Sequence, residues 1–212
     1  MFEDEGNLNM SPENTTMGNI KIWILMLFVT TVTACDGSLS PEEYVKWCST
    51  PDSPLVQKKK TGNFELNLRW RPASLLVLER EGVEMDKGKF NTMVSEMSGF
   101  QHFRLGIRHL GKGFLDRKAM GDNAYQQMMY YLSYHMQNDI YMKTASDSLV
   151  TCQAFHFEGM HHNVGADKAF NLGFDLPDSL RVGASIIVKG KLFPSDSAVF
   201  EIKDIPLPQI NF

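Results

Sequence analysis

The sequence of 212 residues contains few cysteines and no long apolar run. Its three cysteines are Cys35, Cys48 and Cys152, and no two of them have the C-x-x-C spacing of a zinc site. The apolar run at residues 22–29 is too short for a membrane-spanning helix, which needs about 18 or more apolar residues. The sequence therefore indicates neither a cysteine-based zinc module nor a transmembrane helix in this run.

An excess of charge of one sign is also lacking. Without residues 1–34, which contain Lys21 and four acids, 20 bases and 21 acids remain, a net charge of −1. Such a balance lacks the basic surface of a nucleic-acid binder, and we expect no nucleic-acid partner. The one basic run, residues 58–60, predicts a solvated strand edge that guards against aggregation.

The motifs of several common enzymes are missing as well. The sequence has no G-x-S-x-G turn and no H-E-x-x-H helix. Gly111-Lys112-Gly113 is a glycine turn rather than a phosphate-binding loop, which requires G-x-x-x-x-G-K-[ST]. We expect a protein without a cofactor and without catalytic residues.

The short apolar run is typical of a secretory signal peptide, with Lys21 as its positive charge. Residues 1–16 hold four acids and no base, opposite to the start of a signal, so we expect translation to begin at Met17. The alternative is a genuine acidic extension. Residues 1–34 are interpreted as the signal segment.

Val32-Thr33-Ala34-Cys35 resembles the lipobox of bacterial lipoproteins. The resemblance implies cleavage before Cys35 and lipid attachment to its thiol, and two or more acyl chains anchor a protein stably. An ordinary signal peptide cut near Ala34 is the alternative. The expected location is the bacterial cell envelope, with the outer membrane favoured, although Asp36 alone does not distinguish the inner from the outer membrane.

The rest of the chain predicts a mainly β fold, an antiparallel β-sandwich with two or three short helices. Ser40–Cys48 carries a capping box, and Pro72 begins a second helix. Residues 35–54 would hold the lipidated cysteine, the first helix and a linker, and residues 55–212 a single domain. Alternating or apolar runs predict strands at residues 63–71, 103–107, 149–158, 168–174, 185–193 and 198–203.

Two segments are harder to assign. Residues 123–143 fit both a helix and a strand, and we favour a helix to about Met128 with a strand after it. Residues 204–212 contain Pro206 and Pro208, which cannot donate to a sheet, so they cannot be a central strand.

Several short motifs together resemble an uncharacterised family of bacterial lipoproteins. They are YVKWCSTPDSPL, Trp70-Arg71-Pro72, MQNDIYM, CQAFHFE and IKDIPLPQINF. The resemblance implies the same order of parts and a strand through residues 136–140. It assigns no activity and no catalytic residues, and this chain departs from the pattern at GMHHNVG.

The strongest candidate for chemistry lies in residues 152–162. Cys152, His156 and Glu158 share one parity and would share a strand face, with His161 and His162 in the following turn. Thiolate, imidazole and carboxylate are all zinc ligands, so this cluster could bind a metal. The alternative is exposed strand residues followed by a polar loop.

Two further sets of residues complete the candidates. Cys48 and Cys152 could form a disulfide outside the cytoplasm, or remain two buried thiols. Tyr130, Tyr134 and Tyr141 could form a platform for a ligand, or pack across strands.

The expected function is a lipid-anchored, non-catalytic binding or structural role with a protein or glycan partner. One alternative is a metal-dependent hydrolase or metal-binding protein that uses the histidine cluster. Another is a subunit of a larger envelope assembly that pairs through exposed edge strands.

Overall fold

The computed structural model describes residues 37–111, 115–158, 167–193 and 197–212. The chain divides into two units, residues 1–38 and residues 39–212, and the second unit holds both larger sheets and all the helices described below. Cys35, His161 and His162 lie outside the described residues, as does the whole signal segment, residues 1–34. None of the helices in the described ranges is long and apolar enough to cross a bilayer.

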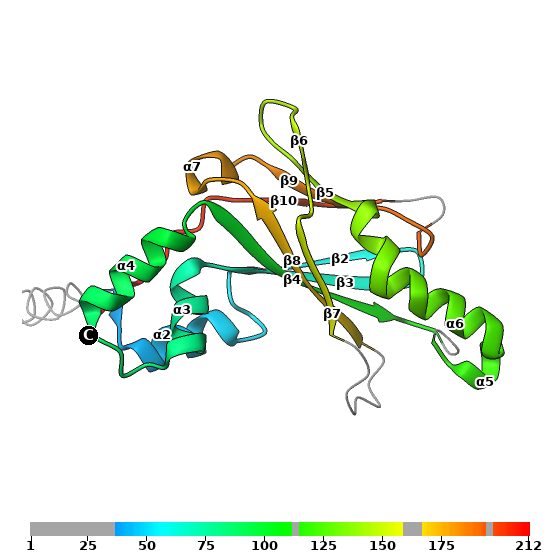
Figure 1. The fold of residues 1–212 in the computed structure, drawn as a ribbon, viewed down its shortest axis with the longest axis horizontal. Coiled ribbons are helices and arrows are strands. Elements are labelled where there is room, and N and C mark those ends of the chain that lie inside the picture. The colour runs from blue at the N-terminus through cyan, green and yellow to red at the C-terminus, as the bar shows by residue number, and fades with distance from the viewer. Residues whose placement is uncertain (1–36, 112–114, 159–166, 194–196) are drawn as a thin grey trace, which may run out of the picture. The chain divides into compact units, whose positions relative to one another are not determined.

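A five-stranded antiparallel sheet forms the centre of the second unit (Figure 1). Its strands in spatial order are β2 (Val56–Thr61), β3 (Phe64–Arg71), β4 (Phe100–His109), β8 (Asp167–Asp175) and β7 (Ala154–Glu158). The predicted alternation is confirmed, since Leu66, Leu68 and Trp70 of β3 are buried. β2 is an edge strand, and its three consecutive lysines are exposed, as the basic run predicted.

A second antiparallel sheet of four strands shares its core with the first. Its order is β10 (Ala198–Glu201), β9 (Ser185–Val188), β5 (Ile140–Lys143) and β6 (Leu149–Thr151). At one edge, the Gln57 side-chain amide donates to the Glu201 carbonyl at 2.8 Å. The two sheets therefore meet through this edge bond as well as through their buried faces.

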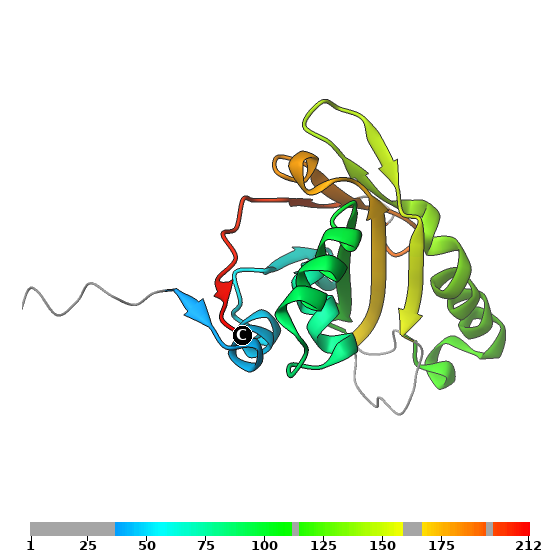
Figure 2. The same cartoon turned by 60° about the vertical axis from the view of Figure 1, so that its left-hand side comes forward.

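The prediction of a sandwich with two or three short helices is wrong in its helix content. Six α-helices occur in the described residues, and the fold is mixed, with 35% strand and 34% helix. They are α2 (Pro41–Ser49), α3 (Ala73–Glu81), α4 (Lys87–Met97), α5 (Arg117–Met120), α6 (Asp122–Tyr130) and α7 (Asp178–Arg181). α2, α3 and α4 gather at one end of the five-stranded sheet and α5 and α6 at the other (Figure 2).

The prediction of a strand after Met128, which included residues 136–140, is also wrong. α6 continues through a π-helical turn, η1 (Tyr131–His135), into a 3₁₀ turn, η2 (Met136–Asp139), and β5 begins only at Ile140. Leu132 and Met136 are both fully buried and lie four residues apart, on one helical face. A strand would also place this pair on one face, but it would bury Tyr130 and Tyr134 with them, and both tyrosines are exposed.

Residues 149–158 do not form the one continuous strand that their sequence predicts. β6 belongs to the four-stranded sheet and β7 to the five-stranded sheet, with Cys152 and Gln153 between them. The amide of Gln153 donates to the Gly173 carbonyl at 2.8 Å, and the carbonyl of Cys152 accepts from Gln137 at 2.7 Å. These bonds satisfy the backbone where the chain crosses from one sheet to the other.

Residues 203–208 run as an extended segment from β10 back toward α2 (Figure 1). As the two prolines predict, this part of the chain is not a central strand. β1 (Ser38–Leu39) and β11 (Gln209–Ile210) are two-residue strands, and the Asn211 amide donates to the Leu39 carbonyl at 2.9 Å. Phe212 packs on Phe90 of α4, with 4.8 Å between ring centroids. The extended segment is thus held at both ends.

Candidate functional site

The residues of the predicted metal cluster that the structure describes have separate surroundings. Cys152 is buried between the two sheets, and its Sγ donates to the Ala154 carbonyl at 3.2 Å. His156 is exposed on β7, and Glu158 of the same strand is half-buried. Within the described ranges, no group of three His, Cys, Asp or Glu side chains is arranged to hold a metal ion.

Glu158 is held by a cation rather than free to bind one. Its carboxylate accepts two hydrogen bonds from Arg104 of β4, at 3.0 and 2.7 Å, and a third from Asn171 of β8, at 3.1 Å. The bonds from Arg104 lower the pKa of the Glu158 carboxyl below its usual value. This carboxylate is ionised and already neutralised by Arg104 at neutral pH.

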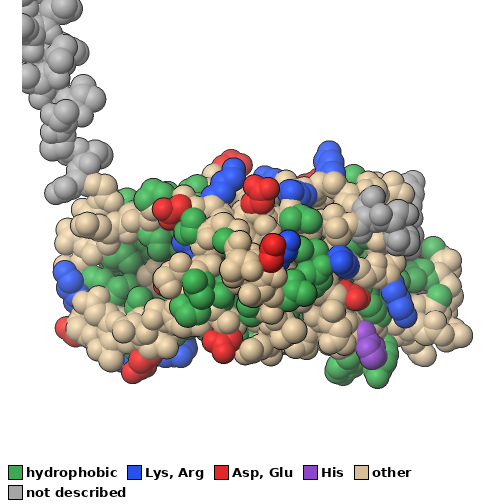
Figure 3. Space-filling view, turned by 90° about the horizontal axis from the view of Figure 1, so that it is seen from above, with side chains coloured by type: hydrophobic (Ala, Val, Ile, Leu, Met, Phe, Trp, Pro, Cys, Tyr) green, Lys and Arg blue, Asp and Glu red, His purple; other side chains and the backbone are tan. Residues whose placement is uncertain are grey.

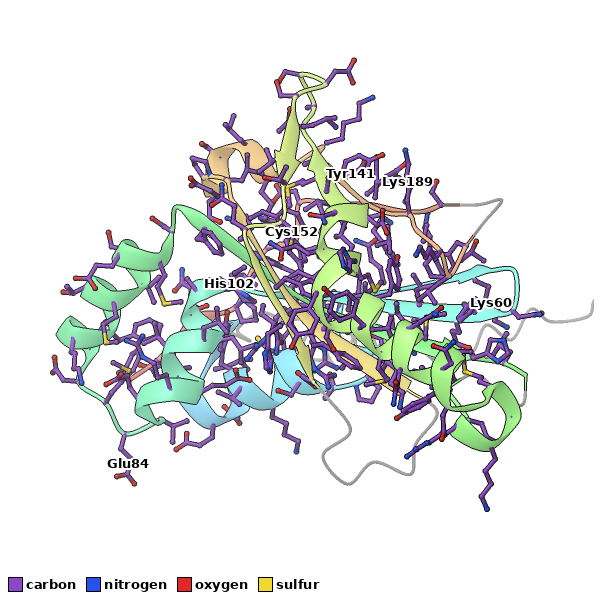
Figure 4. The ribbon with its side chains drawn as sticks, turned by 45° about the vertical axis from the view of Figure 1, so that its right-hand side comes forward. Lys60, Glu84, His102, Tyr141, Cys152 and Lys189 are labelled. Atoms are coloured by element: carbon purple, nitrogen blue, oxygen red, sulfur yellow. The ribbon has the colours of Figure 1, made fainter. Side chains whose placement is uncertain are left out.

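Both described cysteines are free, buried thiols rather than a disulfide. Cys48 lies on α2, and burial raises its pKa to about 11. Burial likewise raises the pKa of Cys152, which lies between the sheets (Figure 4). A raised pKa keeps each sulfur as the unreactive thiol at neutral pH.

The structure brings together two of the three tyrosines proposed as a platform. Tyr130 and Tyr134 are 58% and 67% exposed, with ring centroids 5.2 Å apart. Tyr141 instead lies on β5 beneath Lys189, whose Nζ is 5.2 Å from the ring centroid (Figure 4). Beside Tyr130 is a hollow of about 460 Å³ lined by polar groups, which include Gln127, Asn138 and Asp139.

A different cavity, which the sequence did not predict, has the features of a binding site. Its volume is about 340 Å³, and its walls come from the end of β3, the start of α3, the end of α4, the start of β4, α7 and residues 203–208. The apolar part of the wall includes Val94, Met97, Phe100, Ile205 and Leu207, besides Trp70, Pro72 and Ala73. The polar part includes Arg71, Ser74, Gln101, Asp178 and Arg181. Figure 3 shows hydrophobic side chains around a hollow on the face of the unit that carries α7.

We call this site the Trp70–Arg181 cavity, because these two residues stack on each other in its wall. Trp70 is the last of the buried, inward-facing side chains of β3, and Pro72 is the N-cap residue of α3. The Arg181 guanidinium lies over the Trp70 indole, with Cζ 3.7 Å from the ring centroid. At this separation a cation and an indole face attract each other.

Arg181 is a buried cation with an unused donor. Its side chain is 6% exposed, and its Nη1 donates to the Lys203 carbonyl at 3.2 Å. Its Nε has no hydrogen-bond partner and is closed to water. A buried donor without a partner costs about 1–3 kcal/mol. An acceptor that reached Nε would recover that cost.

No carboxylate among the described residues lies within ion-pair distance of Arg181. Asp178, on the same short helix, accepts a 2.7 Å bond from the side chain of Gln101, whose amide nitrogen also donates to the Leu176 carbonyl. Burial lowers the pKa of Arg181, while Asp178 and Asp204 oppose that change at longer range. The guanidinium nevertheless remains charged, because arginine does not lose its proton in proteins.

Sequence reasoning missed Gln101, Asp178 and Arg181. The alternation of residues 63–71 indicated that Trp70 faces inward, and this is the one part of the cavity that the sequence signalled. α7 has four residues, too few for any periodicity to show that Arg181 is buried.

Comparison with known proteins gives no activity. No family model and no curated protein matches this sequence. A solved protein of unknown function from Burkholderia pseudomallei is similar in structure, with 14% identity, a TM-score of 0.34, and 79% of this chain and 92% of that chain covered. A DUF4426 family protein from Pseudomonas aeruginosa is similar at 9% identity and a TM-score of 0.33, with 73% and 97% covered. Both likenesses are to uncharacterised bacterial proteins.

Proposed function

We propose that the protein is a lipid-anchored, non-catalytic binding protein of the bacterial cell envelope, with its ligand in the Trp70–Arg181 cavity. The observation that carries the binding role is the buried guanidinium of Arg181 in the lining of a partly apolar cavity, with an Nε–H that has no partner. Ligand sites are typically apolar hollows with a few placed polar groups, and this cavity fits that description.

Two observations support binding over catalysis. The Glu158 carboxylate is engaged by Arg104 and Asn171, and therefore has no free acid or base role. The thiols of Cys48 and Cys152 are buried with raised pKa values, which suits packing rather than nucleophilic attack. The lipid tether on Cys35 rests on the lipobox-like Val32-Thr33-Ala34-Cys35.

Metabolic labelling tests the tether. We expect the full chain, produced in a bacterial host, to incorporate labelled palmitate and to sediment with membranes. Cys35→Ser should lose both properties, whereas the control Cys48→Ser should keep both. Equal labelling of Cys35→Ser and the unchanged protein would contradict lipid attachment at Cys35.

A titration with small apolar probes tests the binding role. The full chain in lipid nanodiscs is titrated calorimetrically with octanoate and with 1-octanol, and empty discs serve as the blank. We expect saturable binding of at least one probe at one site per chain. Ser98→Trp, which places a large ring in the cavity lining, should abolish it. No saturable binding of either probe would overturn the binding role.

The exposed tyrosines favour a second candidate function, contact with a glycan. The Tyr130–Tyr134 pair lies beside the polar hollow lined by Gln127, Asn138 and Asp139, and sugars combine a stacking face with hydrogen-bonding edges. A panel of soluble oligosaccharides tests this role. We expect binding of at least one, lost in the Tyr130→Ala, Tyr134→Ala double variant.

A further inference from the structure

The Trp70–Arg181 cavity has an unbalanced charge that specifies the sign of its ligand. Arg71, at the rim, is paired with Glu79 of α3. Arg181, by contrast, has no carboxylate partner within the described residues and is 6% exposed. A buried cation without a directly bonded carboxylate favours an anionic partner, since Asp178 and Asp204 act on it only at longer range. The ligand therefore carries negative charge.

The contacts of Arg181 within the protein leave donors without a partner for that ligand, the buried Nε–H among them. Stacking on Trp70 and the bond to the Lys203 carbonyl explain why the guanidinium is buried in this place. They do not use the Nε–H, which stays without an acceptor. A carboxylate oxygen is a strong acceptor for a guanidinium N–H, since the hydrogen bond is charge-assisted on both sides.

Asp178 limits the number of charges on the ligand. Its carboxylate lines the same cavity and is fixed there by Gln101. A second negative charge on the ligand would meet this carboxylate at close range in a site of low dielectric constant, where like charges repel strongly. A monoanion meets less of this repulsion than a phosphate dianion does, and it still pairs with Arg181.

The apolar wall and the volume define the rest of the ligand. Val94, Met97 and Phe100 lie on one part of the wall, and Ile205 and Leu207 of residues 203–208 complete it. A volume of about 340 Å³ is at the small end of the range for ligand sites, roughly 300–1,000 Å³, and suits a ligand of short or medium length. A small inorganic anion would leave the wall uncovered, and a long acyl chain would extend beyond it.

We propose that the Trp70–Arg181 cavity binds a medium-chain monocarboxylate, with its carboxylate on Nε of Arg181 and its hydrocarbon against Val94, Met97 and Leu207. This inference rests on the proposed binding function and adds the chemical class of the ligand. Because Nε is closed to water, an acceptor reaches it only after a local shift of the cavity wall, of which residues 203–208 form a part. In the described structure these residues contribute apolar contacts and the Lys203 carbonyl to this site.

The test compares three probes that share an eight-carbon chain: octanoate, 1-octanol and octyl phosphate. Each is titrated into the full chain in nanodiscs at pH 7.5, with empty discs as the blank. We expect octanoate to bind at one site per chain at least tenfold more tightly than either other probe. In Arg181→Gln, the preference for octanoate over octanol should fall to about one.

Matched variants separate loss of the site from loss of the fold. Octanol should bind Arg181→Gln as it binds the unchanged protein, which would show that the cavity is intact. Arg80→Gln removes an exposed arginine from α3 and should leave the preference unchanged. Ser98→Trp should block all three probes, and it does not alter Arg181.

Each other outcome overturns the inference in a distinct way. If no probe binds, the binding function itself fails. If octanol or octyl phosphate binds as tightly as octanoate, the binding function stands and the ligand class is wrong. If octanoate keeps its preference in Arg181→Gln, the carboxylate site lies elsewhere.

Discussion

The hydroxyl of Tyr131 donates a 2.6 Å hydrogen bond to the Asp139 carboxylate, and the two residues bracket the irregular turns that follow α6. The same hydroxyl accepts a 3.3 Å bond from the Lys191 amide, and the Asp139 carbonyl accepts from the Lys189 amide at 2.9 Å. Burial, and then Asp139, raise the pKa of Tyr131, so the hydroxyl stays protonated as the donor. The pair thereby joins η1 and η2 to the chain after β9.

Replacing Gly190, which lies between those two lysines, should destabilise the protein. Its φ is +111°, and a Cβ there would overlap the Tyr131 hydroxyl and the Asp139 carboxylate. We expect Gly190→Ala to lower the free energy of unfolding by about 2 kcal/mol or more. The control Gly62→Ala also has a positive φ, +51°, but no atoms near its Cβ, and should lose about 1 kcal/mol. Urea denaturation measures both, and equal losses would contradict the role of the Tyr131–Asp139 contact.

The Arg104–Glu158 pair should make stability depend on pH in the acid range. Because the folded pKa of Glu158 is lowered, its contribution is full above the unfolded pKa of about 4.3 and disappears as pH falls through the folded pKa. We expect Glu158→Gln to be less stable by up to about 1 kcal/mol at pH 7, since the pair is partly exposed. The difference should shrink as the pH is lowered from 7 to 3.

A carboxylate without such a partner provides the comparison. Glu84 is exposed and points away from the body of the unit (Figure 4). Glu84→Gln should leave the denaturation midpoint unchanged at both pH values. A loss of stability in Glu158→Gln that is as large at pH 3 as at pH 7 would contradict the electrostatic explanation.

His102 should add a second pH dependence, nearer neutrality. Burial, and then the charge on Arg71, lower its pKa. The unfolded histidine, with a pKa of about 6.5, binds its proton first, so stability should fall as pH drops below about 7. We expect His102→Gln to reduce the change in unfolding free energy between pH 7.5 and pH 5, and exposed His156→Gln to leave it intact. Identical profiles for all three proteins would contradict this assignment.

The two buried thiols should resist modification until the protein unfolds. In the Cys35→Ser chain, only Cys48 and Cys152 remain, and both are buried with raised pKa values. We expect reaction with an aromatic disulfide reagent at pH 8 to be slow in buffer and complete in urea. Ser146→Cys adds an exposed thiol and should react at once. Rapid reaction of one or both native cysteines would show that their surroundings open.

Local rules correctly predicted the parts of the fold in which one pattern dominates. Ser40 and Glu43 form the predicted capping box, with bonds of 3.3 and 3.0 Å, because both groups lie within one helical turn. The alternating residues 64–71 form β3 as predicted, because successive side chains of a strand point to opposite faces of the sheet.

Other segments depend on partners that are distant in sequence. Tyr130, Leu132, Tyr134 and Met136 fit period two, yet the fold buries Leu132 with Met136 on a helix and leaves both tyrosines exposed. The break at Cys152 depends on Gly173 and Gln137, which no local pattern identifies. The Trp70–Arg181 cavity is similar, because a guanidinium is assigned to the surface by composition and is buried here only through Trp70 and Lys203.

The walls of the Trp70–Arg181 cavity have a consequence for the order of folding. Trp70, Gln101, Arg181 and Leu207 come from widely separated parts of the chain, and residue 207 contributes one side. Contacts of such high sequence separation form slowly, after local helices and hairpins. During synthesis the early strands can pair while the cavity does not yet exist. A chain interrupted before Ile205 would have most of its strands and helices and yet be unable to hold a ligand. Ligand binding would therefore report that the whole domain has folded, which secondary-structure content alone does not.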